Sequence, residues 1–90
     1  MNAPAKYRKR PVVIEAMQWA GDNAEQIIRW AGTVNVRSSS SRPETLRVST
    51  LEGDLFAGIG DWIIRGVVGE FHPVRADIFE QTYEPVGDDQ

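Results

Sequence analysis

Apolar and polar positions near the N-terminus predict an extended segment that leads into a buried strand. Residues 1–6 carry no hydrophobic pattern, and we expect a disordered tail there. Pro11 holds the preceding residue in extended conformations, so the chain enters the next element as a strand. From Val12 to Trp19, apolar side chains occur on both faces, and Glu15 interrupts one of them. Such a strand usually lies at the centre of its sheet, and we predict a central strand here.

The stretch that follows has the spacing of a short amphipathic helix. Asp22 and Glu25 form a D-x-x-E start that resembles a capping box. Gly32 is typical of a helix end. Trp30 falls at the margin of the apolar stripe, where it either closes the core or, if exposed, serves as an interaction anchor. The stripe itself follows the i, i+3, i+4, i+7 spacing and consists of Ala24, Ile27, Ile28 and Ala31.

Two alternating segments predict a β-hairpin in the middle of the chain. Residues 33–37 and 46–49 alternate between apolar and polar positions, and the serine-rich loop of residues 38–44 connects them. Such a loop can bind a partner, although a plain mobile connection explains the composition as well. Residues 55–57 follow as a further short strand. The side chains expected to point inward are Val34, Val36, Leu46 and Val48.

A second hairpin is predicted from residues 62–65 and 70–74. Valine resists the positive φ of a two-residue type I′ turn, so we expect a four-residue loop, Gly66-Val67-Val68-Gly69. Pro73 cannot donate a hydrogen bond to a neighbouring strand, so its strand either lies at an edge of the sheet or ends at this point. The predicted register places Arg65 opposite Glu70, Ile64 opposite Phe71, Ile63 opposite His72 and Trp62 opposite Pro73.

Together these elements predict a single α+β domain over residues 1–90. Asp77 and Glu80 form a second D-x-x-E start, and Pro85 ends the short helix or turn that follows. Residues 86–90 are expected to be an acidic disordered tail. The predicted architecture is a small antiparallel or mixed sheet of about five strands, with one helix packed on one face and the short C-terminal helix or turn after it.

The predicted register gathers ionisable side chains on one face of the second hairpin. Asp61 and Arg65 share a strand face, Glu70 and His72 lie opposite them, and Arg75 follows just beyond. We interpret these residues as a candidate surface for a ligand or partner. The plainer interpretation is a cross-strand ion pair between Arg65 and Glu70 beside a surface histidine. We assign no catalytic residue, no metal ligand and no cofactor, because only His72 and Glu70 are placed together with certainty.

Composition and charge exclude several classes of function. The chain has no cysteine, which excludes disulfides, thiolate zinc sites and cysteine nucleophiles. No apolar run is long enough to span a membrane and no secretion signal is visible, so we expect a cytoplasmic protein. The net charge of −3 is uneven, because residues 76–90 hold only acidic charges whereas the N-terminal arm is basic. That arm, a candidate for phosphate contacts, contains Lys6, Arg8, Lys9 and Arg10.

Two sets of short motifs resemble a group of small phage and prophage proteins of unassigned function. The first is YRKRPVVIEA at residues 7–16, followed by Gln18-Trp19 and Gly21-Asp22-Asn23. The second consists of LEGD at 51–54, GDWIIRG at 60–66, GEF at 69–71 and DIFEQTYE at 77–84. The match covers most of residues 7–84 but leaves out the 35–50 hairpin. The resemblance implies a phage origin and action in the cytoplasm of a bacterial host, and it carries no catalytic residue to transfer.

The sequence leaves three functional hypotheses. We favour a non-enzymatic accessory protein that binds a host protein or a small host molecule, because the phage-like motifs and the small size agree with it. The first alternative is a nucleic-acid-binding protein that uses the basic arm, although the acidic balance of the whole chain argues against it. The second alternative is a small hydrolase or metal enzyme centred on His72 and Glu70. Open sheet edges also make a homodimer a partner hypothesis.

Overall fold

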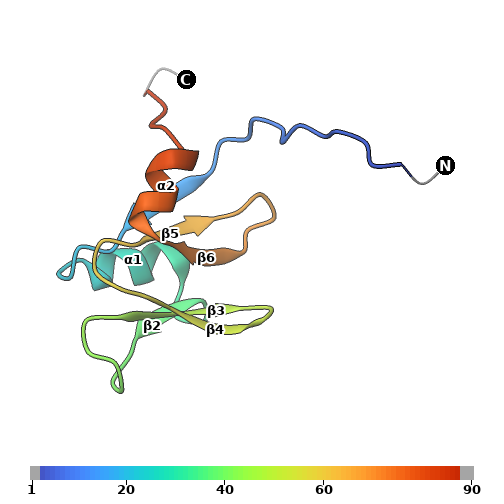
Figure 1. The fold of residues 1–90 in the computed structure, drawn as a ribbon. Coiled ribbons are helices and arrows are strands. Elements are labelled where there is room, and N and C mark those ends of the chain that lie inside the picture. The colour runs from blue at the N-terminus through green and yellow to red at the C-terminus, as the bar shows by residue number, and fades with distance from the viewer. Residues whose placement is uncertain (1–2, 88–90) are drawn as a thin grey trace.

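The computed structural model describes residues 3–87, which form two antiparallel sheets of three strands each and two helices (Figure 1). The first sheet has the order β1-β5-β6 and consists of β1 (Glu15–Gln18), β5 (Trp62–Arg65) and β6 (Phe71–Val74). The second has the order β2-β3-β4 and consists of β2 (Val36–Ser38), β3 (Leu46–Thr50) and β4 (Gly53–Ala57). The helices are α1 (Ala24–Ala31) and α2 (Ala76–Thr82). The α+β class is confirmed, while the predicted tails at 1–6 and 86–90 lie partly outside the described residues.

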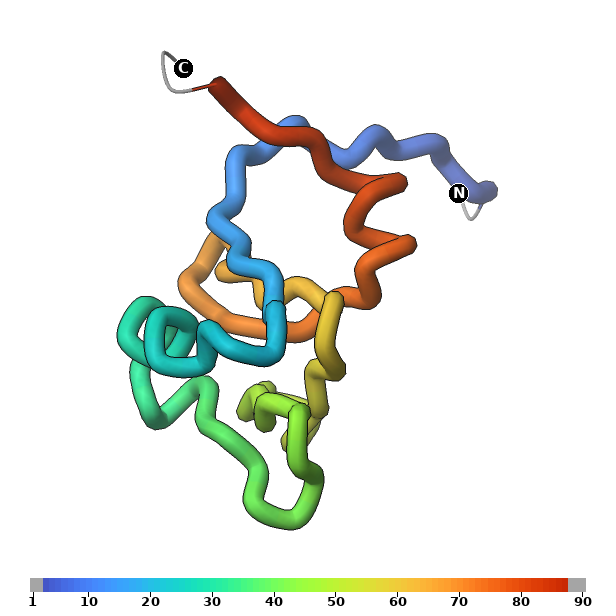
Figure 2. The backbone as a smooth tube through the Cα atoms, turned by 90° about the vertical axis from the view of Figure 1, so that its left-hand side faces the viewer, coloured from blue at the N-terminus to red at the C-terminus, as the bar shows by residue number. Residues whose placement is uncertain are grey.

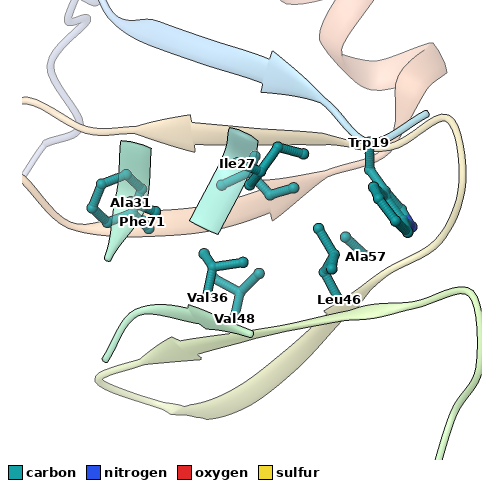
Figure 3. Close-up of a cluster of buried hydrophobic side chains, with 9 residues drawn as sticks. Trp19, Ile27, Ala31, Val36, Leu46, Val48, Ala57 and Phe71 are labelled. Carbon is teal, nitrogen blue, oxygen red and sulfur yellow. The ribbon is translucent and has the colours of Figure 1, made fainter. Parts of the chain in front are cut away.

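Two small sheets stand where the sequence predicted a single sheet of about five strands. Their inner faces pack on each other, and α1 closes one side of the space between them (Figure 3). This sandwich buries an apolar face of each sheet, whereas the eight residues of α1 are too few to cover one wide sheet. The core cluster consists of Trp19, Ile27, Ala31, Val36, Leu46, Val48, Ala57, Ile63 and Phe71.

The inward positions of the middle hairpin are confirmed except for one. Val36, Leu46 and Val48 are fully buried, whereas Val34 is 78% exposed. The reason is that β2 begins only at Val36, after a turn in which the Val36 N–H donates to the Gly32 carbonyl at 3.0 Å. Val34 lies in that turn, where strand alternation does not apply.

Strand β1 is an edge strand, so the prediction of a central strand is wrong. The central strand is β5, which pairs with β1 on one side and with β6 on the other. The apolar residues on both faces of β1 have a different cause. Met17 packs against the core, while Ala16 on the opposite face lines a cleft on the side of the sheet that α2 covers (Figure 1). The edge position predicted for the strand of Pro73 is confirmed, because β6 is the other edge.

Helix α1 begins after Asn23, and the side chain of Asp22 does not cap it. The Asn23 side chain accepts the N–H of Ala20 at 2.9 Å and donates to the carbonyl of Gln18 at 2.9 Å, so it fastens the helix start to the end of β1. The predicted helix end is confirmed, since Gly32 terminates α1 with a φ of 93°.

Two of the tryptophans close the core at different points. Trp19 is 5% exposed, and its indole N–H donates to the Glu44 carbonyl at 3.0 Å. Trp30 is half-buried and meets the Phe71 ring edge-on, with the ring centroids 5.2 Å apart. Its indole N–H lies 3.2 Å from the Glu15 carboxylate. Trp30 therefore closes the margin of the core, which is the first of the two roles that the sequence left open.

The register of the β5–β6 hairpin is shifted by one residue, so the predicted register is wrong. The Gly66 N–H donates to the Glu70 carbonyl at 2.7 Å, and Gly69 has a φ of 90°, so the loop has three residues. Three-residue hairpin loops with a left-handed glycine are common. A shift of one residue exchanges the faces of β5 relative to β6. The observed pairs are Trp62–Val74, Ile63–Pro73, Ile64–His72 and Arg65–Phe71.

We expect Gly69→Ala to lower the free energy of unfolding by about 1–2 kcal/mol, because a left-handed φ strains any residue with a Cβ. Gly58→Ala is the matched control. Gly58 does not have a left-handed φ, and the nearest atom to an added Cβ would be a carboxylate oxygen of Asp61 at 3.8 Å. There the substitution should be neutral or stabilise by about 0.4–1 kcal/mol. Urea unfolding followed by tryptophan fluorescence measures both variants, and equal losses would contradict the three-residue loop.

Candidate functional site

The register of β5 creates an apolar strip on the outer face of the first sheet. Trp62 and Ile64 lie on the same face as Ala16 of β1 and His72 of β6, and they point away from the core between the sheets. Ile64 is nevertheless only 2% exposed. It lines a cleft together with residues of the segment 9–14, so the N-terminal segment helps to cover this face.

Helix α2 covers the same face through stacked aromatic rings and not through a buried stripe. No residue of α2 is fully buried. The Phe79 ring stacks on the Trp62 indole with the centroids 4.1 Å apart and the planes at 7°. Tyr83 follows, with its ring centroid 5.0 Å from that of Phe79, and the Lys9 ammonium lies 5.7 Å from the Tyr83 centroid. We call Trp62, Phe79 and Tyr83 the aromatic stack. It joins β5, α2 and the N-terminal segment.

A cleft of about 1020 Å³ lies between residues 11–14, the outer face of the sheet and α2. Ala16 and Trp62 line it from the sheet, and Phe79 and Tyr83 line it from the C-terminal side. Figure 2 shows the N-terminal segment and α2 on opposite sides of this region, with the chain after α2 crossing back toward the N-terminal segment. Most of the lining residues are apolar, so the cleft offers hydrophobic contact to a bound molecule.

A second cleft of about 340 Å³ continues from the first, and Tyr83 lines both. Its lining combines two basic residues of the arm, Lys9 and Arg10, with Glu70 and His72 of the second hairpin. The combined groove therefore has a long, mostly apolar part, whose lining also includes Glu80 and Glu84, and a smaller part in which Lys9 and Arg10 outnumber the carboxylate of Glu70.

Of the five residues predicted to form a polar patch, Glu70 and His72 line this groove together. Asp61 instead holds the turn before β5, where its carboxylate accepts a backbone N–H at 3.0 Å. Arg75 pairs with Asp77 at 2.8 Å at the start of α2. The predicted patch is thus divided among separate parts of the molecule.

The predicted ion pair between Arg65 and Glu70 is wrong, because the register separates the two side chains onto different faces. Arg65 lies opposite Glu15 of β1, and its Nη1 is 3.3 Å from the Glu15 Oε1. These side chains are 50% and 64% exposed, so the pair contributes at most about 1 kcal/mol. The Glu70 carboxylate accepts the Val68 N–H at 3.2 Å and lies over Gly66.

The fold also divides the basic arm. Lys9 and Arg10 line the smaller cleft, whereas Lys6 and Arg8 are exposed on the extended segment before it. Lys9 and Arg10 therefore line the same cleft as Glu70 and His72. The sequence had predicted the first pair for nucleic-acid binding and the second pair for a separate ligand or partner surface.

Within residues 3–87, no group of three His, Cys, Asp or Glu side chains is placed to hold a metal ion. In the same part of the chain, no helix has the length and apolar character to cross a membrane. The hypothesis of a metal enzyme is centred on His72 and Glu70. Both residues lie in the smaller cleft, which Lys9 and Arg10 also line.

The sequence did not single out Phe79 and Tyr83 as site residues. Their i, i+4 spacing places both on one face of a helix, and this is the signal that indicates an aromatic face on α2. The third aromatic residue of the stack, Trp62, lies on the outer face as the partner of Phe79.

Comparisons with known protein families, with curated proteins and with solved structures found no match for this chain.

We expect Phe79→Ala to loosen α2 and to lower the free energy of unfolding by about 1–3 kcal/mol, because it removes the ring that stacks on Trp62. The fluorescence of Trp62 should change in the same variant. Ile78→Ala is the matched control in the same helix, since Ile78 is 46% exposed, and it should cost about 0.5 kcal/mol or less. Urea unfolding measures both, and equal losses would show that the stack does not dock α2.

Proposed function

We propose that this chain is a small non-catalytic binding protein whose ligand is a small amphipathic anion. The site is the groove between the N-terminal segment, the outer face of the first sheet and α2. The observation that carries the proposal is the continuity of an apolar cleft with a cationic end. Ligand sites are usually mostly apolar clefts of about 300–1,000 Å³, with a few polar groups that orient the ligand.

The lining of the groove defines the chemistry of the ligand. The aromatic stack suits an apolar body that is flat or aliphatic. At the other end, Lys9 and Arg10 outnumber the carboxylate of Glu70. Guanidinium and ammonium groups favour a carboxylate or phosphate as the polar end of the ligand. An apolar molecule of moderate size with one anionic end therefore fits both parts.

A binding role suits Glu70 and His72 better than a catalytic one. A histidine that acts as a general base is commonly oriented by a carboxylate. The Glu70 carboxylate is instead held within its own hairpin by the Val68 N–H at 3.2 Å. In our proposal His72 is a polar contact for the anionic end of the ligand.

The resemblance of residues 7–84 to small phage and prophage proteins stays a prediction. If the chain acts inside a bacterial host, as that resemblance implies, the ligand is a small molecule of the host. An accessory protein of this kind would act by sequestering or sensing that molecule.

Native mass spectrometry of the full chain purified from bacterial cells tests the proposal. We expect a bound small molecule in the wild type and about a tenfold lower affinity in Ala16→Leu, because Ala16 lines the cleft and a larger side chain narrows it. Ala20→Leu is the matched control, since Ala20 is exposed outside the groove and the same substitution should leave binding unchanged.

Thermal unfolding of both variants shows whether they remain folded. Full retention of the ligand by a folded Ala16→Leu variant would contradict the site. Recovery of the wild type with a host polypeptide and no small molecule would contradict the proposed ligand class.

A further inference from the structure

The outer face of the second sheet carries a row of cationic and aromatic side chains. Arg37 of β2 lies opposite Arg47 of β3, and Arg47 lies opposite Phe56 of β4. The neighbouring residues Val36 and Val48 are fully buried, so the alternation of strand side chains points the row away from the core. This face lies on the opposite side of the molecule from α2 (Figure 1).

The serine-rich loop places a third arginine over this row. The loop is folded back on itself, because the buried Ser39 hydroxyl accepts the Arg42 N–H at 3.2 Å and the Thr45 hydroxyl donates to the Arg42 carbonyl at 2.6 Å. The indole N–H of Trp19 ties the end of the loop to the core. As a result, the Arg42 guanidinium lies 4.1 Å from the centre of the Phe56 ring.

The positive charge of this face is weakly compensated. Asp54 lies 3.5 Å from Arg47, but their side chains are 43% and 37% exposed, so the pair holds Arg47 weakly. The covered Nε of Arg47 donates to no acceptor among residues 3–87. Arg37 is exposed directly opposite Arg47, and like charges in this position repel each other. An anionic partner relieves this repulsion and accepts hydrogen bonds from the exposed parts of the Arg37 and Arg47 guanidinium groups.

We propose that this face binds single-stranded nucleic acid. Phosphates contact the guanidinium N–H groups of Arg37, Arg42 and Arg47, which suit oxyanions because of their planar array of donors. The Arg42 guanidinium, which lies over the Phe56 ring, also provides a surface on which a base stacks. This site is separate from the groove and from the basic arm.

The form of the face favours a single strand over other anions. A free nucleotide requires a concave pocket, whereas both clefts described above lie elsewhere. A duplex keeps its bases stacked on one another, so it cannot use the Arg42–Phe56 surface. An acidic peptide offers charge to the arginines without a base for that surface.

Fluorescence anisotropy with a labelled single-stranded DNA of about 12 nucleotides tests the proposal on the full chain. Three arginine–phosphate contacts predict a slope of about −2 for the logarithm of the affinity against the logarithm of the salt concentration. Arg37→Gln and Arg42→Gln should each make the slope about 0.7 less steep. Arg29→Gln is the matched control, because Arg29 is exposed on α1 with Glu25 at 3.7 Å, and it should change neither affinity nor slope.

Phe56→Leu tests the stacking contribution. This variant should bind about tenfold more weakly, and the loss should persist at high salt, because stacking does not depend on counterion release. Phe56→Tyr keeps the ring and should retain the affinity. Thermal unfolding monitors the fold. If Phe56→Leu does not fold, two other single variants test the proposal: the affinity of Phe56→Tyr and the salt slope of Arg37→Gln.

Several outcomes would overturn the proposal. These are the absence of binding at low salt, equal affinity for a blunt duplex, and more effective displacement by polyglutamate than by unlabelled strand. An unchanged slope in Arg37→Gln and Arg42→Gln, with binding lost in the Lys9→Gln/Arg10→Gln double variant, would assign the interaction to the arm.

Discussion

The three-residue loop between β5 and β6 is the constraint on which both faces of the first sheet depend. Because the loop is odd in length, Ile63 and Phe71 face the core together, while Trp62, Ile64 and His72 face outward. An even loop would turn the indole of Trp62 into the core and would leave α2 without its stacking partner. The docking of α2, and the groove beneath it, therefore follow from the single position at which a glycine in this loop adopts a left-handed φ.

Elements that depend on local pattern were predictable, and their arrangement was not. The apolar stripe of α1, its end at Gly32 and the edge position of Pro73 follow from the chemistry of a few neighbouring residues. The partition into two sheets and the edge position of β1 depend on contacts between distant segments. Apolar residues on both faces of β1 report that both faces are covered, and they carry no information about how many strands lie beside it.

The candidate site shows the same limit. Glu70 and His72 were predictable as a pair, because residues two apart in a strand share a face. Their meeting with Lys9 and Arg10 depends on the path of the N-terminal segment across the sheet, which no local pattern encodes. Arg65 was misplaced for a different reason, since an error of one residue in the loop length moves its side chain to the other face.

The two outer faces differ because the chain covers one and leaves the other open. On the first sheet, apolar outward side chains recruit α2 and the N-terminal segment. On the second, the outward row is Arg37, Arg47 and Phe56, and the loop adds Arg42. The net charge of −3 does not describe this face. Charges farther apart than about 8 Å are largely screened at physiological ionic strength, so the acidic side chains of α2 on the far side do not cancel the field of the arginines. Local arrangement, and not total charge, therefore determines which partners such a surface attracts.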